Sequence, residues 1–425
     1  MARRRPRCAR RCCVALIAAY TSPAIAHAFP FAGILLELQA RGHRIRMRTL
    51  ASEVDRMRML GFDADEIDPA IDRIEFDDWR ARSPLDALLR LSELYCVRGA
   101  LDGPDLQDLI DDSRPDIVLT DVNTWGAAAV AERSGLPWIA ISPYTPVLRS
   151  RGLPAFGPGL RPARGLFERM RNAAIGRAVL EAATARAMPA INALRADVAG
   201  LPPRADFDAV LRRAPQMLVT TAEPLEYAHV DWGPRIRMVG PTSWEPQAPT
   251  PPWLDELEGP IVLVTTSGDY QGDTDIARVA LMALADEPVS VVATIPGDAP
   301  LGFEPPANAR ITRFLPHSAV LERAVCAVTH GGMGVTQKAL GLGVPVVVVP
   351  WGRDQHEVAA RVEHAGCGVR VNRGQLTPER VRDAVRRARR MGAGAEAVAR
   401  GFAAAGGPTR AADLVEEQLA LQARR

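Results

Sequence analysis

The stretch from Thr329 to Gln355, THGGMGVTQKALGLGVPVVVVPWGRDQ, most constrains how this chain folds. An apolar strand at 326–329 runs into a glycine-rich turn, the turn opens a helix at 333–341, and a second apolar strand follows at 344–349. A strand, helix, strand unit of this kind is typical of a parallel sheet. The glycines let the backbone approach a ligand closely, and the first helical N–H groups attract an anion. We expect that anion to be a diphosphate.

These residues resemble the donor-binding signature of the GT-B glycosyltransferases, in particular the inverting enzymes that use UDP- or dTDP-sugars to glycosylate small molecules. In that family a His-x-Gly turn holds the diphosphate, and an Asp-Gln or Glu-Gln pair after the next strand binds the sugar hydroxyls. His330 and the pair Asp354 and Gln355 match both elements in order. The alternative is a Rossmann dinucleotide site, but GGMG lacks the G-x-G-x-x-G spacing and no acidic ribose ligand follows at the usual distance.

The resemblance also implies the remaining donor contacts. They are Ser267, Gly268, Phe314, Leu315, Gly331, Gly332, Gly334, Val335 and Thr336. The loop of Ser267 and Gly268 is expected to face the diphosphate across the cleft. Phe314 matches the position whose aromatic ring stacks on the nucleobase, with the Leu315 backbone at the base edge. Core packing is the alternative for Phe314.

Two positions depart from the family pattern. Val335 stands where members often have Ser or Thr on the phosphate, so either its backbone amide suffices or Thr336 substitutes. Lys338 stands where plant members have a Glu that binds the ribose hydroxyls. An ammonium group cannot accept those hydrogen bonds. The sequence therefore weakens a UDP assignment and leaves dTDP, which lacks the 2′-hydroxyl, at least as well supported.

His27 is the candidate base. It begins an H-x-x-P pattern ending at Pro30, whereas the resembling family has Gly-His-x-x-Pro in a loop; Ala26 replaces the glycine here. Histidine suits the role because its unperturbed pKa of about 6.5 leaves it mostly neutral at pH 7. The alternatives are an incidental loop residue or part of a cleaved signal.

A base histidine needs a carboxylate on its other ring nitrogen. Asp121 ends an apolar strand at the edge where parallel sheets gather ligands, and the resemblance pairs such an Asp with the base. A helix N-cap is the alternative role, although Asn123 or Thr124 could cap that helix instead.

Composition limits the class of protein. A chain of 425 residues with 47% hydrophobic and 24% charged residues is typical of a globular protein of two domains. Its formal net charge of +2 argues against a nucleic-acid partner. Six cysteines without a C-x-x-C pair, and without a nearby His at ligand spacing, favour free thiols in a reducing cytoplasm and no metal site. We expect no stable membrane insertion, and a homodimer stays open.

The first 28 residues allow two interpretations. An arginine-rich start, a short apolar run and an A-x-A-like site before Phe29 could be a secretory signal. Cleavage there would remove the first strand of a parallel sheet, so we favour a strand at 14–20 preceded by a disordered extension at 1–13. After a loop, we expect an amphipathic helix at about 30–40 with Gly42 as its stop.

Short apolar strands alternate with helical stretches in both halves, which predicts an α/β protein with parallel sheets. The expected strands are 14–20, 45–50, 117–120, 138–142 and 216–220, then 261–265, 289–294, 311–314, 326–329 and 344–349. Two long insertions, 76–111 and 144–200, are expected to build a pocket. The expected parts are an acceptor-binding domain at 1–240, a proline-rich linker at 241–260, a nucleotide-sugar domain at 261–408 and a final helix at 409–425 that packs back on the first domain.

The prediction is a GT-B fold, two facing Rossmann-like domains with a cleft, that transfers a sugar with inversion to a small, largely apolar acceptor. His27, held by Asp121, would take the acceptor proton. The helix start would stabilise the departing diphosphate, so neither a metal nor a cofactor is expected. A cell-envelope glycolipid is the rival acceptor, and a catalytically silent nucleotide-binding partner of another transferase is the rival class. Asp63 and Asp65 form a D-x-D string that we interpret as an acidic loop.

Overall fold

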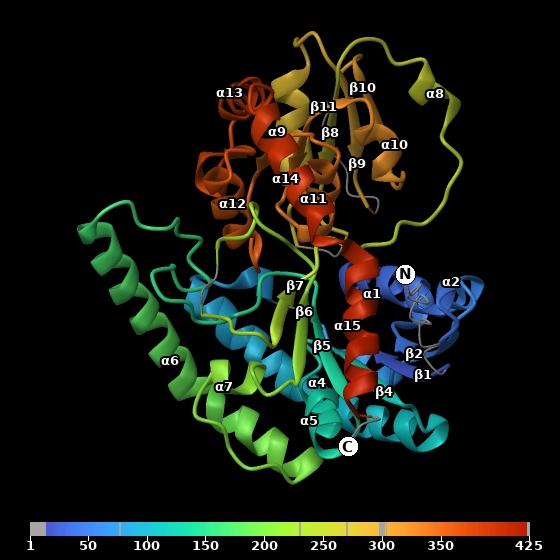
Figure 1. The fold of residues 1–425 in the computed structure, drawn as a ribbon. Helices are drawn as coiled ribbons and strands as arrows, with labels where there is room; N and C mark the ends of the chain where they lie inside the picture. Colours follow the sequence, from blue (N-terminus) through green and yellow to red (C-terminus); the bar gives the residue numbers. More distant parts are fainter. Residues whose placement is uncertain are drawn as a thin grey trace, which may run out of the picture.

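The computed structural model describes residues 14–75, 78–228, 231–268, 271–296, 302 and 304–422. It contains two parallel sheets, one from each half of the chain (Figure 1). The predicted extension at 1–13 lies outside the described residues.

The first sheet has seven strands in the order β3-β2-β1-β4-β5-β6-β7. Its strands are β1 (Leu16–Tyr20), β2 (Arg44–Thr49), β3 (Asp63–Glu66), β4 (Ile117–Asp121), β5 (Trp138–Ser142), β6 (Gln216–Val219) and β7 (Ile236–Met238). The order reverses between β1 and β4, and the crevice at such a switch point is where open α/β sheets bind ligands.

The second sheet has six strands in the order β10-β9-β8-β11-β12-β13. Its strands are β8 (Ile261–Thr265), β9 (Ser290–Thr294), β10 (Ala309–Thr312), β11 (Ala324–Thr329), β12 (Val346–Val348) and β13 (Gly368–Arg370). Its switch point lies between β8 and β11. Two parallel sheets with crossover helices confirm the predicted fold class.

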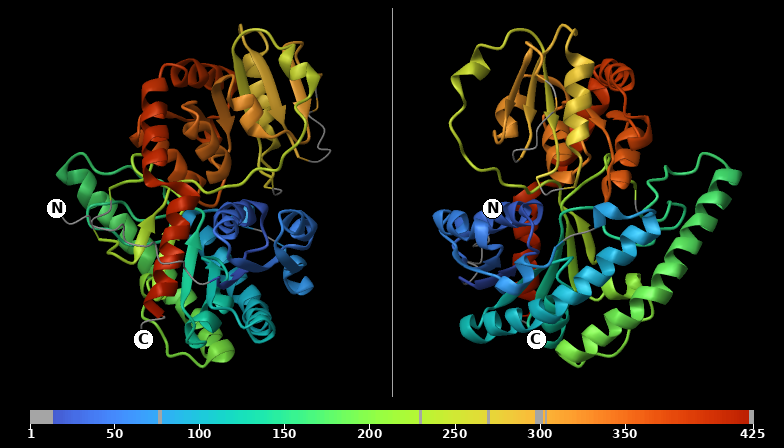
Figure 2. Two further views of the ribbon diagram at one scale, coloured as in Figure 1. Left: turned by 45° about the vertical axis from the view of Figure 1, so that its right-hand side comes forward. Right: turned by 180° about the vertical axis from the view of Figure 1, so that it is seen from behind.

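Helices cover both faces of each sheet (Figures 1 and 2). Those of the first half are α1 (Ile25–Ala40), α2 (Val54–Met59), α3 (Pro69–Asp72), α4 (Pro84–Ser113), α5 (Trp125–Arg133), α6 (Leu166–Ala199) and α7 (Phe207–Leu211). Those that follow are α8 (Pro252–Asp255), α9 (Thr274–Leu284), α10 (His317–Leu321), α11 (Met333–Gly341), α12 (Gln355–His364), α13 (Pro378–Ala388), α14 (Gly392–Ala405) and α15 (Gly407–Gln422). Among the described residues, none of the helices is both long and apolar enough to cross a bilayer.

The sequence predicted the central strands better than the edges. The predicted ranges 138–142 and 261–265 coincide with β5 and β8, both fully buried, whereas β3, β7 and β13 were not foreseen. These three are edge strands, short and partly polar, so their sequences lack the apolar run of a buried strand. In β3, Asp63 and Asp65 both bond Arg46, at 3.1 and 2.5 Å.

The predicted start of α1 was wrong. We expected a loop through His27 and a helix from Pro30, but α1 begins at Ile25 and includes both residues. A proline fits helical φ and costs one hydrogen bond, so it does not have to mark the helix start. His27 therefore lies in the first turn of a helix, which fixes its backbone more firmly than a loop would.

The segment that follows the first half and the C-terminal helix α15 both pack on α1. At the start of the segment 241–260, Thr242 donates to the carbonyl of Pro30 at 3.0 Å. The segment contains one short helix, α8, which the prediction of an irregular linker did not include. From the other end of the chain, Arg41 of α1 bonds Asp413 and Glu416 of α15 at 2.8 and 3.0 Å. The helix that carries His27 is thus held on two sides.

Gly33 of α1 tests this packing. A Cβ there would lie 1.7 Å from the Thr242 carbonyl oxygen. We expect Gly33→Ala to lower the free energy of unfolding by about 2 kcal/mol, because either α1 or the segment must move. Urea unfolding measures this. Gly392→Ala is the control, since a Cβ at Gly392 meets no atom within 4 Å; equal losses in both variants would contradict the packing argument.

Candidate active site

A cavity of about 580 Å³ lies at the carboxyl ends of both sheets, and residues from both halves line it. This volume is in the range of about 300–1,000 Å³ usual for small-molecule sites. His27 follows β1, Asn123 follows β4, Ser267 follows β8 and His330 follows β11. The two switch points therefore open into the same space.

His27 and Asp121 are in direct contact. The His27 Nδ1 and Asp121 Oδ2 atoms lie 2.7 Å apart, and Asp121 is fully buried. The other carboxylate oxygen of Asp121 accepts the Asn123 backbone N–H at 2.8 Å. A buried carboxylate so placed holds the proton on Nδ1 and leaves Nε2 as the basic nitrogen.

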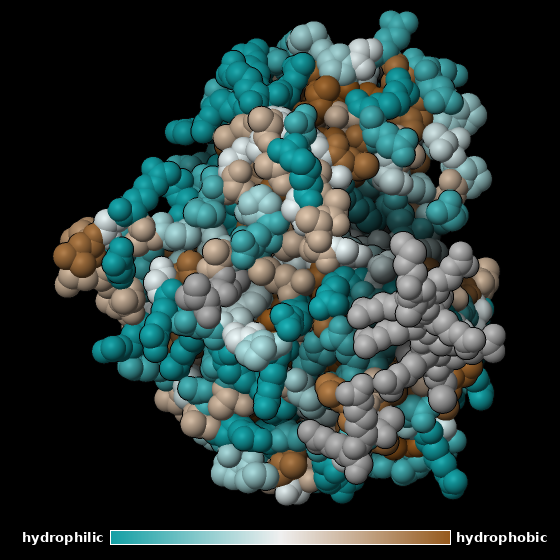
Figure 3. Space-filling view, viewed as in Figure 1, coloured by the Kyte–Doolittle hydropathy of each residue, from teal (hydrophilic) through white to brown (hydrophobic). Residues whose placement is uncertain are grey.

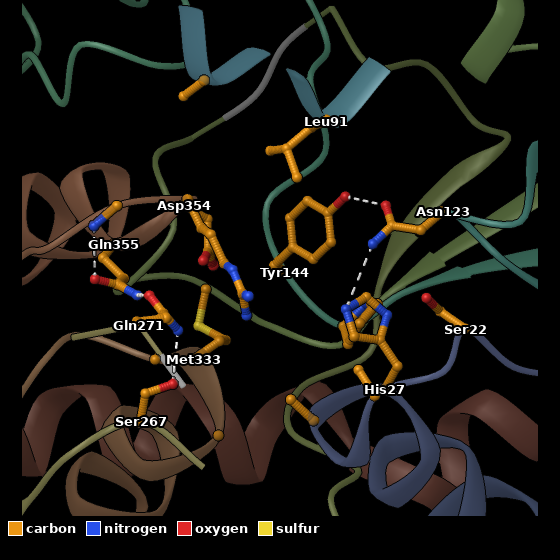
Figure 4. A pocket seen from close by; sticks show the side chains of 18 of the residues that line it. Ser22, His27, Leu91, Asn123, Tyr144, Ser267, Gln271, Met333, Asp354 and Gln355 are labelled. Atoms are coloured by element: carbon orange, nitrogen blue, oxygen red, sulfur yellow. Dashed lines mark hydrogen bonds between the residues drawn. The ribbon is translucent and has the colours of Figure 1, made fainter. Parts of the chain in front are cut away.

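Two side chains beyond this pair complete the network around the imidazole. The Tyr144 hydroxyl donates to Asn123 Oδ1 at 2.5 Å, and Asn123 Nδ2 lies 3.5 Å from His27 Nε2 (Figure 4). Burial raises the pKa of Tyr144 well above its ordinary value, so its hydroxyl stays a donor. With its oxygen engaged by Tyr144, the amide presents its NH₂ to the imidazole. Neither residue was predicted from the sequence to have a catalytic role, because their distance to His27 depends on the fold.

The glycine turn before α11 has the shape that the sequence predicted. Gly331 has a φ of 94°, and a Cβ there would lie 2.7 Å from Val348 Cγ1. The N-cap of α11 is Gly332, which offers no side-chain cap to the first helical amides. His330 and the turn residues Gly332, Gly334 and Val335 line the cavity. The helix start therefore faces the space in front of His27.

Some predicted donor residues lie away from the cavity wall that the described residues form. Thr336 is fully buried and Leu315 packs in the core, while Phe314 exposes 58% of its surface outside the cavity. Thr336 therefore does not substitute for Val335 through its hydroxyl. Gly331 also lies behind the wall, where it shapes the turn. The base-stacking role of Phe314 stays a prediction.

Gln355 organises the turn before α12 at the cavity wall. Its Oε1 accepts the backbone N–H groups of Trp351 and Gly352 at 2.7 and 3.0 Å, and its Nε2 donates to Gln271 at 2.8 Å. Gln271 in turn donates to Ser267 Oγ at 2.6 Å. This series of hydrogen bonds joins the turn before α12 to the loop after β8 (Figure 4). Gln271 was missed because nothing in the local sequence marks it.

Asp354 lies beside these hydrogen-bonded glutamines and faces the cavity (Figure 4). Burial raises the pKa of Asp354 to about 6, although backbone hydrogen bonding and the charge of Arg353 oppose the shift. Arg353 precedes it with a φ of 51°, in the left-handed region that is uncommon for a side chain of this size. The turn thus holds two charged side chains in fixed directions.

Lys338 forms an ion pair that the sequence did not reveal. Its Nζ lies 2.5 Å from Glu245 Oε1, and Glu245 also accepts the backbone N–H groups of His317 and Ser318 at 3.0 and 3.2 Å. Burial raises the pKa of Glu245, but the Lys338 charge and the hydrogen bonds from Lys338 and Ser318 together outweigh it, so the pKa stays below its ordinary value. Lys338 and His317 line the cavity, and burial lowers the pKa of His317 to about 4. This end of the cavity therefore presents a neutral imidazole and a paired ammonium.

Comparisons with known proteins agree with this geometry. Residues 278–418 match the family model of the erythromycin biosynthesis protein CIII-like C-terminal domain. The 4'-demethylrebeccamycin synthase of Lentzea aerocolonigenes is 35% identical over 390 residues, which cover 86% of this chain and 90% of that protein. A PGL/p-HBAD biosynthesis glycosyltransferase of Mycobacterium tuberculosis (strain ATCC 25177 / H37Ra) is 30% identical over 309 residues, 71% of this chain and 69% of that protein.

The chain belongs to this family of natural-product glycosyltransferases. Solved structures agree: the glycotransferase of kitacinnamycin superposes with a TM-score of 0.74 and 25% identity, covering 95% of this chain and 99% of that one. The calicheamicin glycosyltransferase CalG4 gives 0.72 at 23% identity, covering 96% and 99%. The predicted family, the GT-B fold and the class of enzyme, a hexosyltransferase, are confirmed.

The first half gives the glycosyltransferase a largely apolar chamber. Three aromatic rings stack edge to face there: Tyr95 and Trp125 have centroids 5.3 Å apart, and Trp125 and Phe207 are 6.2 Å apart. Other apolar side chains on this wall are Ile25, Phe29, Trp79, Leu88, Leu91 and Phe156. These come from α1 and from the two long insertions, as predicted for a pocket.

Tyr144→Phe tests the network around the imidazole. Without the hydroxyl, the Asn123 amide is free to turn and His27 loses its orienting contact, so we expect kcat to fall about tenfold with the donor dissociation constant unchanged. Steady-state kinetics measures kcat, and calorimetric titration measures the donor dissociation constant. Tyr227→Phe is the control. The Tyr227 hydroxyl lies outside this network and donates to the Leu160 carbonyl at 3.4 Å. Equal effects in both variants would show that Tyr144 acts only by packing.

The raised pKa of Asp354 predicts a pH dependence of donor binding. Asp354 is predicted to bind the sugar hydroxyls. The carboxylate accepts through both oxygens, whereas the acid turns one of them into a donor, and the carboxylate form is lost as the pH falls through about 6. We expect the dissociation constant of a nucleotide sugar to rise about tenfold between pH 7.5 and pH 5, and the dependence to flatten in Asp354→Asn. Calorimetry without acceptor measures donor binding alone. The diphosphate of a nucleotide sugar does not titrate in this pH range, so the pH dependence comes from the protein. Retention of the full dependence in Asp354→Asn would assign it to another group.

Proposed function

We propose that the glycosyltransferase moves a sugar from a dTDP- or UDP-sugar to a hydroxyl of a small, largely apolar acceptor, with inversion in one displacement. The observation that carries this is the His27–Asp121 pair, which faces the open start of α11 across one cavity. The acceptor hydroxyl gives its proton to His27 Nε2 while its oxygen bonds the anomeric carbon. The bond from that carbon to the diphosphate breaks, and the diphosphate leaves with the electron pair.

Each charge that develops in this step has a partner. Asp121 stabilises the imidazolium that forms on His27. The amides that begin α11, the positive end of its dipole and His330 receive the departing diphosphate. The proposed reaction therefore takes its electrostatic stabilisation from the protein and needs neither a metal nor a cofactor. Asp354 is proposed to hold the sugar, with Gln355 fixing the turn that carries it.

The donor proposal rests on the nucleotide end of the cavity. Lys338 brings an ammonium where a ribose-binding carboxylate would otherwise stand, which favours a dTDP-sugar over a UDP-sugar. Two structural neighbours, VinC and the spinosyn rhamnosyltransferase SpnG, have been solved with dTDP and thymidine diphosphate, at 21% and 17% identity. Their likeness shows the fold alone, so the donor is tested directly.

The acceptor proposal rests on the aromatic chamber, which suits an aromatic or polycyclic metabolite. One relative is named 4'-demethylrebeccamycin synthase, after a product of natural-product biosynthesis. A cell-envelope glycolipid is the second candidate, because other relatives act in PGL/p-HBAD biosynthesis. The intact pair of base and carboxylate argues against a catalytically silent partner protein.

Slow hydrolysis of the donor tests the proposal without knowledge of the acceptor. The protein is incubated with a panel of UDP- and dTDP-sugars, and release of the nucleoside diphosphate is followed by mass spectrometry. We expect turnover of at least one dTDP-sugar. No binding and no turnover of any sugar nucleotide would overturn the proposed function.

His27→Gln separates catalysis from binding. Loss of the base is expected to lower transfer to an acceptor about 10²–10⁴-fold, with donor affinity and thermal stability kept. The control is His364→Gln, because His364 lies at the end of α12 outside the cavity wall. Transfer at the original rate in His27→Gln would exclude the imidazole as the base.

A further inference from the structure

An apolar patch lies at the beginning of α6. Leu166, Phe167 and Met170 expose 71%, 80% and 64% of their surface. These positions and the exposed Ala173 and Ala174 recur at helical spacing, so they share one outward face. Single exposed apolar residues are ordinary on a protein, but three large ones on adjoining positions form a continuous patch. We call these five residues the α6 patch.

The beginning of α6 stands away from the body of the molecule. In the ribbon views, α6 begins in a corner that projects from the molecule and then runs back along the first half (Figures 1 and 2). In the space-filling view this corner, at the left edge, carries brown apolar atoms bordered by teal polar ones (Figure 3). A flat surface could reach the corner without meeting the rest of the protein.

Arginines flank the α6 patch in the sequence. Five lie between residues 161 and 177, against one acidic side chain, Glu168, and all five are exposed: Arg161, Arg164, Arg169, Arg171 and Arg177. Arg171 bonds only the neighbouring Asn172 amide oxygen, and Arg177 approaches Glu181 at 3.9 Å. Arg161, Arg164 and Arg169 form no ion pair with any residue that the structure describes. The corner thus combines apolar side chains with a strong local positive charge.

We propose that the α6 patch and its arginines dock the protein on an anionic lipid surface. The apolar side chains would enter the boundary between headgroups and acyl chains, and the guanidinium groups would bind lipid phosphates. A second copy of the chain fits less well, because a two-fold contact would place the same five arginines against each other. The charge pattern therefore favours anionic lipid over self-association.

The docked corner is connected to the cavity wall. The loop that enters α6 supplies Phe156 and Gly157 to the cavity. The same loop is tied to α6 by Asn172, whose Nδ2 donates to the Arg161 carbonyl at 3.0 Å. Taken with the proposed function, docking would bring the acceptor chamber to a surface where apolar acceptors accumulate. This last step rests on the proposed function, whereas lipid binding does not.

Sedimentation with vesicles tests the proposal. The full chain is mixed with vesicles of phosphatidylcholine alone or with added phosphatidylglycerol, and the bound fraction is measured at low and high salt. We expect binding that needs phosphatidylglycerol and weakens with salt. The triple substitution Leu166→Ser, Phe167→Ser and Met170→Ser should lower the partition coefficient at least about tenfold. Replacing Arg161, Arg164 and Arg169 by Ser should remove the salt dependence and most of the binding.

A matched triple substitution controls for general loss of surface hydrophobicity. Met59, Met282 and Leu421 expose 80%, 44% and 56% of their surface on other elements, and their replacement by Ser should leave vesicle binding unchanged. Thermal unfolding, measured without vesicles, confirms that each variant is folded, and this control depends neither on docking nor on the proposed function. A wild-type chain that stays in the supernatant with every vesicle would overturn the proposal. So would equal losses in the control, or a wild-type dimer that only the patch variant converts to monomer.

Discussion

The hydrogen bond between His27 and Asp121 depends on how two neighbouring strands pair. β1 and β4 are in register with Tyr20 opposite Thr120, so the turn after β1 and the residue that ends β4 emerge side by side. A slip of one residue would turn Asp121 to the other face of the sheet, since side chains alternate along a strand. Both strands are buried on both faces, which fixes the register. The position of His27 relative to Asp121 is therefore set by the core of the first sheet rather than by local contacts.

Helices α11 and α12 carry the cavity wall that lies opposite His27. Buried polar contacts between the two halves of the chain hold these helices in place. Gln337 of α11 donates to the Thr220 carbonyl after β6 at 2.7 Å. Arg361 of α12 bonds Glu226 at 2.6 Å, and Glu357 accepts from two amides of the loop before α6. Removing one partner of a buried ion pair leaves an uncompensated buried charge, which costs about 3–5 kcal/mol. These contacts tie the helix that begins at Gln355 to the loop before α6.

What the sequence predicted and what it missed follow from the range of the interactions. The helix at 333–341 matches α11 residue for residue, because the glycine turn and the apolar strands that flank it are local signals. The start of α1 was misplaced because a proline inside a helix has the same local appearance as one at its start. Asn123, Tyr144 and Gln271 were missed because each acts through a side chain distant in sequence.

Lys338 shows how such distance changes the interpretation of a substitution. From the sequence alone, a cation replaces the carboxylate that plant relatives place on this helix, and one charge of the site is reversed. In the structure Glu245, from the segment between the sheets, restores a carboxylate beside the same helix and holds the ammonium at 2.5 Å. The two charges compensate, so the cavity end gains a directed donor without a net charge. Under the proposed function, a cavity end lined by groups that donate favours a nucleotide that presents acceptors at this position over one that must donate a 2′-hydroxyl.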